Sequence, residues 1–308
     1  MTIVPPAQPG RLKTVGVLLS LLFVLLISTQ LNARPNQQTV VQKHCLWEVQ
    51  TDTNKVFLLG SLHLLKSDAY PLAAAMDAAY RQSPIVVFET DIGAMEDPSV
   101  QAVMLTMATY PEGESLRQHI PADMQKALKE KMANLGMPLE LFVRFKPWFL
   151  AVTLTSLELE RLGFSPLNGI DVHYYGKARS DEKTIDFFET IDYQLDLLGK
   201  MSADNQKDFL GQTLKDLEIA AEMADDMMRY WQKGQVAKLH TLLFKSFEDY
   251  PEIEDRLLLQ RNKNWVEKIE AMLGGPENVL VVVGAGHLIG PGSVVDILRQ
   301  KGHKVEQK

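Results

Sequence analysis

Short apolar runs closed by glycine mark two positions along the chain, and they predict the central strands of a sheet. Residues 279–283 read VLVVV and are followed by Gly-Ala-Gly-His, while residues 56–59 read VFLL and are followed by Gly-Ser-Leu-His. A short apolar run bounded by glycine is typical of a strand that is buried on both faces. Each run is therefore predicted to be a buried strand that ends in Gly-x-x-His.

The rest of the pattern predicts an α/β (α+β) fold with a small mixed, largely parallel sheet and large helical insertions. Residues 45–49 and 55–59 flank the turn residues TDTN and predict a hairpin. A helix over 70–82, opened by Pro71, then leads to a strand at 85–88, and this order predicts a parallel pair joined by a crossover. The further helices are predicted at 100–109, 121–135, 148–162, 171–179, in pieces over 192–234, at 249–273 and at 293–302, and the further strands at 184–188 and near 304–306.

Domain organisation follows from where these elements fall. Strands cluster near the two ends of the predicted folded region and at 184–188, whereas residues of about 99–162 and 192–273 are helical. We therefore expect a single domain over 45–308 with two helical insertions. Residues 34–44 are polar and are expected to be a linker.

The N-terminal segment has the pattern of a secretory signal. Arg11 and Lys13 precede the uncharged apolar residues 15–27. This run is short for a membrane span, which needs about 20 apolar residues. Residues 1–33 are therefore predicted to be a signal peptide, and the alternative is an uncleaved membrane anchor. Contact with a membrane is expected only through this segment, and only if it is not cleaved. In both cases the folded part is expected to be exported to the periplasm or the cell surface.

The net charge of the chain argues against two classes of binding partner, nucleic acid and anionic lipid. Removing residues 1–33 changes the formal net charge from −7 to −9, because Arg11 and Lys13 are the only charged residues lost. An acidic protein without a basic run is a poor partner for nucleic acid or anionic lipid. Cys45 is the only cysteine, which excludes an intrachain disulfide, and it is expected to be a small apolar residue at the start of a strand.

The ends of the predicted strands carry the residues that could perform chemistry. His63 and His287 each follow a buried strand, and Glu89 ends the strand at 85–88. Ligands of open α/β sheets bind beyond the carboxyl ends of the strands. Two imidazoles and a carboxylate there could hold a divalent ion such as Zn, Mn or Co and leave a position open for water. The alternative is that each histidine only bonds to the backbone in its turn.

Further polar residues could complete such a site. Glu189 could act as a base, or it could cap the helix that follows it. Asp171 could orient a ligating histidine, whereas His173 fits a solvated helix face better. Arg261 and Asn262 could bind a substrate carboxylate or an oxyanion. The sequence contains no His-Glu-x-x-His, Gly-x-Ser-x-Gly or phosphate-binding glycine motif.

Taken together, these segments resemble the TraB/GumN family, whose relatives include the TIKI metalloproteases. The matching segments are GSLHLL at 60–65, VVFET at 86–90, GIDVHYYGKA at 169–178, FFET with Gln194 at 187–194, RNKNW at 261–265 and the block at 283–305. The resemblance implies that His63, Glu89 and His287 are active-site positions. It also implies a metal-dependent protease that works outside the cytoplasm.

Two functions from different classes are compatible with the sequence. The first is an exported metal-dependent hydrolase that acts on a peptide or a small amide, with the ion on His63, Glu89 and His287 and with Glu189 or Glu89 handling the proton. The second is a periplasmic or surface protein that binds and sequesters a small peptide or signal without turnover. Two histidines beside a carboxylate are more than sequestration requires, so the sequence favours the hydrolase. Oligomeric state is left open.

Overall fold

Six strands form one mixed sheet in the computed structural model, which describes residues 42–308. The strands are β1 (Leu46–Gln50), β2 (Lys55–Ser61), β3 (Ile85–Phe88), β4 (Thr184–Phe187), β5 (Val279–Gly284) and β6 (Val305–Gln307). Their order across the sheet is β4-β3-β5-β2-β1-β6. The four strands from β4 to β2 are parallel, and β1 is antiparallel to both of its neighbours. The predicted mixed, largely parallel sheet is confirmed.

Several expectations concern residues outside the described part of the chain. The predicted signal segment at 1–33 and residues 34–41 of the predicted linker fall there. Within residues 42–308, no helix is both long enough and apolar enough to pass through a membrane.

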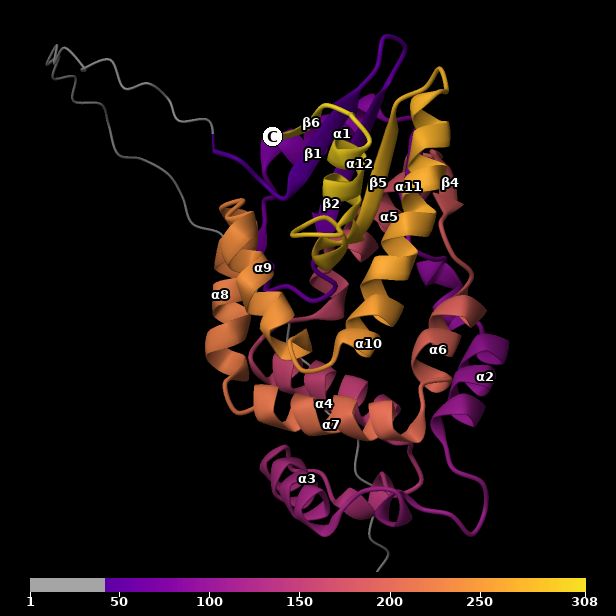
Figure 1. Ribbon diagram of the computed structural model, residues 1–308, viewed down its shortest axis with the longest axis vertical. Coiled ribbons are helices and arrows are strands. Elements are labelled where there is room, and N and C mark those ends of the chain that lie inside the picture. The colour runs from indigo at the N-terminus through magenta and orange to yellow at the C-terminus, as the bar shows by residue number, and fades with distance from the viewer. Residues whose placement is uncertain (1–41) are drawn as a thin grey trace, which may run out of the picture. The chain divides into compact units, whose positions relative to one another are not determined.

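Strand β5 lies at the centre of the parallel region. It pairs with β2 on one side and with β3 on the other, and residues 279–283 are all at most 3% exposed. Figure 1 shows α11 (Gln260–Leu273) and α12 (Val294–Gln300) on one face of the sheet, and α1 (Ala74–Gln82) and α5 (Ile170–Ser180) on the other. Because helices cover both faces, every side chain of the strand must be apolar, and the sequence shows an unbroken apolar run instead of an alternating one.

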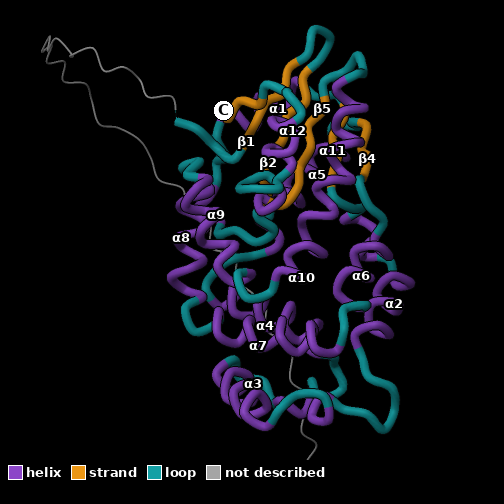
Figure 2. Tube along the Cα trace, viewed as in Figure 1, coloured by secondary structure: helices purple, strands orange, loops and turns teal. Residues whose placement is uncertain are grey.

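The two helical insertions supply the remaining helices. These are α2 (Pro98–Ala108), α3 (Ala122–Asn134) and α4 (Pro147–Arg161) in the first, and α6 (Ile191–Gly199), α7 (Ala203–Asp216), α8 (Ala220–Gln232), α9 (Val236–Phe244) and α10 (Pro251–Glu254) in the second. Figure 2 shows most of these helices beyond one edge of the sheet, the edge at which its parallel strands end. Helices α3, α4 and α7 enclose a hydrophobic core of their own around Leu128, Leu150 and Leu210. The insertions therefore add a helical layer at that edge.

The predicted crossover needs one correction. β2 and β3 are parallel and are connected through α1, as predicted, but they are not neighbours, because β5 lies between them. A strand from the far end of the sequence has inserted between the two. This arrangement places the two Gly-x-x-His strands, β2 and β5, side by side.

Two predicted helices also differ from the structure. α1 begins at Ala74 and not near Tyr70, because residues before it stay extended and the hydroxyl of Tyr70 donates to the carbonyl of Asn168 at 2.9 Å. The single helix predicted over 249–273 is interrupted by a π-helical turn at Asp255–Leu259. Such turns alter the ordinary carbonyl pairing and often occur at functional sites. Here the carbonyl of Leu257 accepts from Nη1 of Arg261 at 2.9 Å.

Candidate functional site

The carboxyl edge of the parallel strands brings the predicted site residues together. Ser61 at the end of β2 pairs with Gly284 at the end of β5, so the two Gly-x-x-His segments leave the sheet side by side. Glu89 follows β3 on the other side of β5. Glu189 follows β4, and its backbone N–H donates to the carbonyl of Glu89 at 2.8 Å. The four strand ends thus form one continuous rim.

The candidate groups meet at Gly284. A Cβ atom added to this glycine would lie 3.2 Å from Oε1 of Glu89, 3.6 Å from Nε2 of His63 and 3.6 Å from Cδ2 of His287. Glycine therefore leaves a small space that two imidazoles and a carboxylate border. The same residues line a hollow of about 320 Å³. Two histidines that lie 224 positions apart in the numbering come together because their strands are hydrogen-bonded neighbours.

His63 is oriented by Asp171 on α5. Oδ2 of Asp171 lies 2.7 Å from Nδ1 of His63, and Oδ1 accepts a hydrogen bond from the hydroxyl of Ser61 at 3.2 Å. The charge of Asp171 is the main cause that raises the pKa of His63 to about 9. With Nδ1 held in this way, Nε2 faces the space at Gly284. A carboxylate on the far nitrogen is the usual way in which a metal-binding histidine is oriented.

Replacing Asp171 should disturb His63 in a measurable way. Asp171→Asn removes the negative charge but keeps the shape, so the pKa of His63 should fall from about 9 toward its ordinary value of 6.5 in metal-free protein. Loss of this orientation should also weaken metal binding or activity roughly 10–100-fold. NMR titration of the histidine ring measures the first effect. Asp225→Asn, at an exposed carboxylate paired with Lys66, is the control. An unchanged His63 pKa would contradict the assigned contact.

His287 is held differently, because it is buried with both ring nitrogens engaged. Its side chain is 5% exposed. Nδ1 lies 2.6 Å from Oδ1 of Asn262, whose Nδ2 donates to the carbonyl of Gly292 at 2.9 Å. Since the amide oxygen can only accept, Nδ1 carries the proton, and Nε2 accepts from Nη1 of Arg261 at 3.1 Å. Burial, together with the charge of Arg261, lowers the pKa of His287 to about 3, so the ring is neutral at neutral pH.

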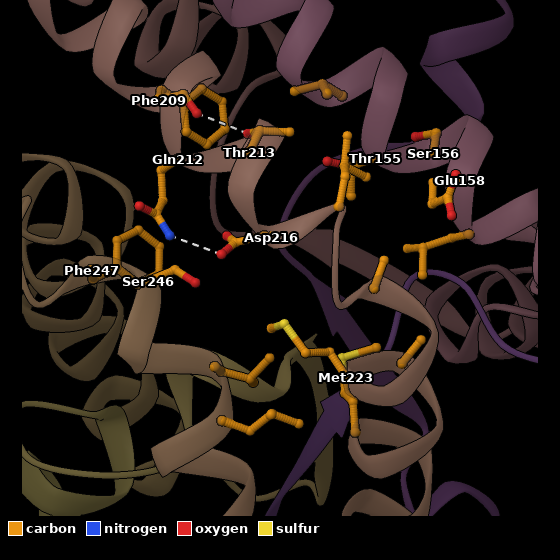
Figure 3. Close-up of a pocket in the computed structure, with 18 of the residues that line it drawn as sticks. Thr155, Ser156, Glu158, Phe209, Gln212, Thr213, Asp216, Met223, Ser246 and Phe247 are labelled. Atoms are coloured by element: carbon orange, nitrogen blue, oxygen red, sulfur yellow. Dashed lines mark hydrogen bonds between the residues drawn. The ribbon is translucent and has the colours of Figure 1, made fainter. Parts of the chain in front are cut away.

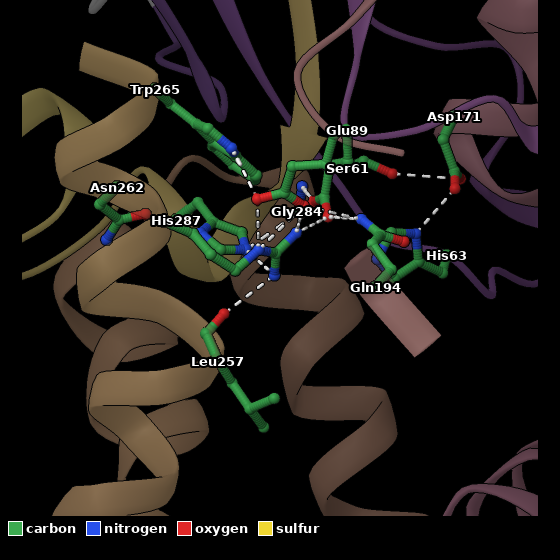
Figure 4. Close-up of polar contacts among 12 residues, drawn as sticks. Ser61, His63, Glu89, Asp171, Gln194, Leu257, Asn262, Trp265, Gly284 and His287 are labelled. Carbon is green, nitrogen blue, oxygen red and sulfur yellow. Dashed lines mark hydrogen bonds and ion pairs between the residues drawn. The ribbon is translucent and has the colours of Figure 1, made fainter. Parts of the chain in front are cut away.

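Arg261 connects the two carboxylates of the rim, of which Glu89 is labelled in Figure 4. Its Nε donates to Oε1 of Glu189 at 2.9 Å, and its Nη2 donates to Oε2 of Glu189 at 2.9 Å and to Oε2 of Glu89 at 2.6 Å. Gln194 donates to both carboxylates at 3.2 Å, and the indole N–H of Trp265 donates to Glu189 at 2.9 Å. A planar guanidinium suits this arrangement because it offers several donors in fixed directions.

Glu89 presents the carboxylate oxygen nearest to the space at Gly284. Oε1 accepts the backbone N–H of Gly284 at 2.7 Å and lies 3.9 Å from Nε2 of His287. Burial opposes ionisation of this carboxyl, but the neighbouring His287, Arg261 and His63 lower its pKa to about 2. Glu89 is therefore ionised over the whole physiological range and is an acceptor only.

The donor set can be compared with the needs of a divalent ion. Within residues 42–308, no three histidine, cysteine, aspartate or glutamate side chains already have the spacing of a metal site. Nε2 of His63 and Oε1 of Glu89 border the space at Gly284, and histidine–carboxylate sets suit zinc and related ions. Nε2 of His287, however, accepts a hydrogen bond from Arg261. The residues fit an ion in type, and binding requires His63, whose pKa is raised to about 9, to lose a proton and Arg261 to release Nε2 of His287.

The structure also shows contacts that the sequence did not predict. Thr190, and not Glu189, caps α6, since its side chain accepts from the N–H of Tyr193. His173 is half-buried, with ring centroids 5.3 Å from Tyr70 and 4.9 Å from Tyr174, and does not lie on a solvated face.

Arg261 and Asn262 were predicted to bind substrate. Arg261 does line the hollow, while Asn262 holds His287. Their role toward a substrate stays a prediction. The sequence does not predict the contacts of Gln194 and Trp265. The one indication that these residues matter is their place in the family-like segments, Gln194 in FFET-x₃-Gln and Trp265 in RNKNW.

The fold and the site define a mixed α/β protein with a His/Glu/His cluster at the carboxyl edge of its parallel strands. The chain belongs to the TraB/PrgY/gumN family, whose model matches residues 45–307. It is 25% identical to the uncharacterized protein YbaP of Escherichia coli over 83% of this chain and 94% of that protein.

More distant relatives carry a functional name. The chain is 21% identical to the metalloprotease TIKI homolog of Nematostella vectensis over 85% of its length, and 21% identical to human metalloprotease TIKI1 over 85%. The matches span 66% and 61% of those two proteins. No solved structure matches the chain.

Proposed function

We propose that the protein is an exported metal-dependent hydrolase that cleaves peptide bonds or similar amide bonds. The observation that carries the proposal is the meeting of His63, Glu89 and His287 around the space at Gly284. The metalloprotease relatives support the same class of reaction. Their similarity to this chain is low, so the proposal depends first on the geometry of the site.

Each residue of the site has a role in this proposal. A divalent ion held by His63, Glu89 and His287 would lower the pKa of a bound water and polarise the carbonyl of the substrate. Asp171 keeps Nε2 of His63 directed at the space. Asn262 fixes the tautomer of His287, so that Nε2 stays unprotonated, as a metal ligand must be.

Arg261 and Glu189 form the support behind these ligands. Arg261 anchors Glu89, and Glu189 holds Arg261 with both of its oxygens. Because the oxygens of Glu189 already accept from Arg261, Gln194 and Trp265, we propose that it acts mainly by positioning Arg261. Its role as a base stays a prediction.

One observation favours a second candidate, a protein that binds a small peptide without cleaving it. Nη1 of Arg261 occupies the lone pair of Nε2 of His287. If this hydrogen bond persists in solution when ions are present, the three-ligand site does not form. The hollow would then be only a polar binding site with a neutral histidine, a carboxylate and a bound guanidinium.

A cleavage assay with matched histidine variants separates the two candidates. Purified protein is tested for metal content and then incubated with a peptide library, with chelator or with added Zn, Mn or Co. We expect cleavage only in the presence of metal. His63→Ala should abolish it, while His303→Ala, at a histidine bound to Glu270 on α11, should leave it intact. Stoichiometric peptide binding without cleavage under every metal condition would instead support the binding protein.

Export is proposed on the pattern of residues 1–33 and needs its own test. Residues 1–40 are fused to a reporter enzyme that is active only outside the cytoplasm. An active reporter is expected, because Arg11 and Lys13 precede an uncharged apolar segment. An inactive reporter that stays soluble in the cytoplasm would reject the assignment.

A further inference from the structure

A second and larger hollow lies among the inserted helices. Its volume is about 460 Å³, which is within the range of pockets that hold a small organic ligand. α4, α7, α8 and α9 contribute to its walls, together with residues 246–253 (Figure 3). Ser156 and Ser246 lie on its walls, and Figure 3 shows both among the drawn lining residues.

This helical hollow adjoins the hollow at the His/Glu/His cluster. Leu64, Leu159, Met227 and Leu243 line both. Leu64 directly follows His63 in the chain, so one end of the helical hollow lies next to the candidate site. A single substrate molecule can therefore contact both.

Most residues that line the helical hollow are apolar, and several of its polar side chains are hydrogen-bonded to other protein groups. The hydroxyl of Thr155 donates to the carbonyl of Ala151 at 2.9 Å, and the hydroxyl of Thr213 donates to that of Phe209 at 2.8 Å. Gln212 donates to Asp216 at 2.8 Å (Figure 3). The hydroxyl hydrogens of Thr155 and Thr213 and one N–H of Gln212 are therefore already used within the protein.

The buried carboxylate in the wall is also neutralised. Glu158 is 3% exposed and forms ion pairs with Arg161 at 2.6 Å and with Lys131 at 3.3 Å. A cationic occupant would have to compete with two residues that already hold this carboxylate. The other polar groups in the walls are the hydroxyls of Ser156, Ser246 and Tyr250 and the carboxylate of Asp216, which accepts from Gln212, so the lining remains mainly apolar.

These properties of the walls distinguish two possible occupants, a peptide with apolar side chains and a hydrocarbon chain. A peptide that entered the hollow would bring backbone N–H and C=O groups, and burying them without partners is unfavourable. A hydrocarbon chain brings no polar group, and each methylene that it buries should strengthen binding about fourfold, given ~0.8 kcal/mol per buried CH₂. The chemistry of the walls therefore favours an alkyl chain over a peptide.

We propose that the helical hollow binds the hydrocarbon chain of a long-chain fatty acyl amide, with its amide group at the His63 end. This inference rests on the proposed hydrolase function for the fate of the amide, and the binding of the chain itself does not depend on turnover. In the hydrolysis, water supplies the oxygen of the new C–O bond, the C–N bond breaks, and the amine leaves with a proton. The products are a fatty acid and an amine.

Binding of an N-acylglycine series tests the proposal. N-Acylglycines with acyl chains of two to sixteen carbons compete with a fluorescent fatty acid for the full-length protein. Each N-acylglycine is used below its critical micelle concentration. We expect affinity to rise about fourfold per methylene until the chain fills the hollow and then to level off. Affinity that is independent of chain length would overturn the proposal. So would stronger competition from apolar peptides that carry no acyl chain.

Two filling variants from different walls locate the bound chain. Ser156→Trp and Ser246→Trp should each weaken the binding of long acyl chains at least tenfold, while short chains bind as before. The chain length at which affinity stops rising should become shorter than in wild type. Thr241→Trp, at an exposed position of α9 outside the lining, is the matched control. Melting temperatures identify a variant that fails to fold, in which case the other decides. If every folded filling variant keeps the wild-type plateau, the chain binds elsewhere and the proposal is wrong.

A catalytic variant separates this inference from the proposed function. His63→Ala should keep the chain-length dependence of binding, because His63 is not part of the helical hollow. If wild type and His63→Ala both bind long chains and neither hydrolyses an amide, the hydrolase function fails and the acyl-binding hollow stands. If wild type hydrolyses short amides with no dependence on chain length, the hydrolase function stands and the acyl hollow is rejected.

Discussion

His287→Ala is expected to abolish metal-dependent activity and metal binding while leaving a folded protein. The variant removes one of three candidate ligands, and even changes behind a ligand cost roughly 10–100-fold in metal affinity. It also removes hydrogen bonds to Asn262 and Arg261 in a buried position, so the metal-free protein should lose about 1–3 kcal/mol of unfolding free energy. Both losses are measurable on the same sample.

The response of the melting temperature to metal is the sharpest measurement. At a metal concentration of about 100 times Kd, wild type should gain about 2.7 kcal/mol, which corresponds to roughly 5–10 °C for a domain of this size. His287→Ala should gain almost nothing, and His303→Ala should respond like wild type. If His287→Ala keeps its metal and its activity and only melts earlier, His287 is a structural residue. The hydrolase proposal would then lose its site, because His63 and Glu89 alone make too weak a constellation.

The parts of the site that lie at strand ends were predictable, and the reason is local. A buried parallel strand must be apolar throughout, so 56–59 and 279–283 stand out, and the glycine that closes each run fixes where the strand ends. Parallel strands end at one edge, which made it reasonable to expect His63 and His287 in one crevice. This expectation held only if the two strands were neighbours, which the sequence does not determine. The structure shows that β2 and β5 are neighbours.

The support behind the ligands was not predictable, because it depends on how a distant helix is rotated. Arg261 and Asn262 were expected to face a substrate. The π-helical turn before α11 precedes both residues, and Arg261 contacts Glu89 and Glu189 while Asn262 contacts His287. No periodicity in the sequence indicates that turn. The helical hollow was unpredictable for a similar reason, since it is a gap between packed helices and has no motif of its own.

Arg261→Ala is expected to be one of the most destabilising substitutions in the described part of the chain. The side chains of Arg261 and Glu189 are each 8% exposed and that of Glu89 is 15% exposed, so removing the guanidinium leaves two buried carboxylates without their cation. Breaking a buried pair in this way costs about 3–5 kcal/mol, a large part of the 5–15 kcal/mol that stabilises a typical domain. Urea unfolding in the presence of chelator measures the loss. Arg229→Ala, at an exposed arginine paired with Asp226, should leave the midpoint unchanged.

A double-mutant cycle tests whether the loss arises from the unpaired charge. Glu189→Gln keeps the shape of the side chain and removes one of the two carboxylates that Arg261 neutralises. The double variant Arg261→Ala with Glu189→Gln should therefore be more stable than the sum of the single losses implies, by about 0.5–3 kcal/mol. Strict additivity would mean that Arg261 stabilises the protein through packing on Trp265, whose ring centroid lies 4.7 Å from the guanidinium carbon. The ion pairs of Arg261 would then only reflect the position of α11. Glu89 would have to be held in place by its hydrogen bonds from Gly284 and Gln194.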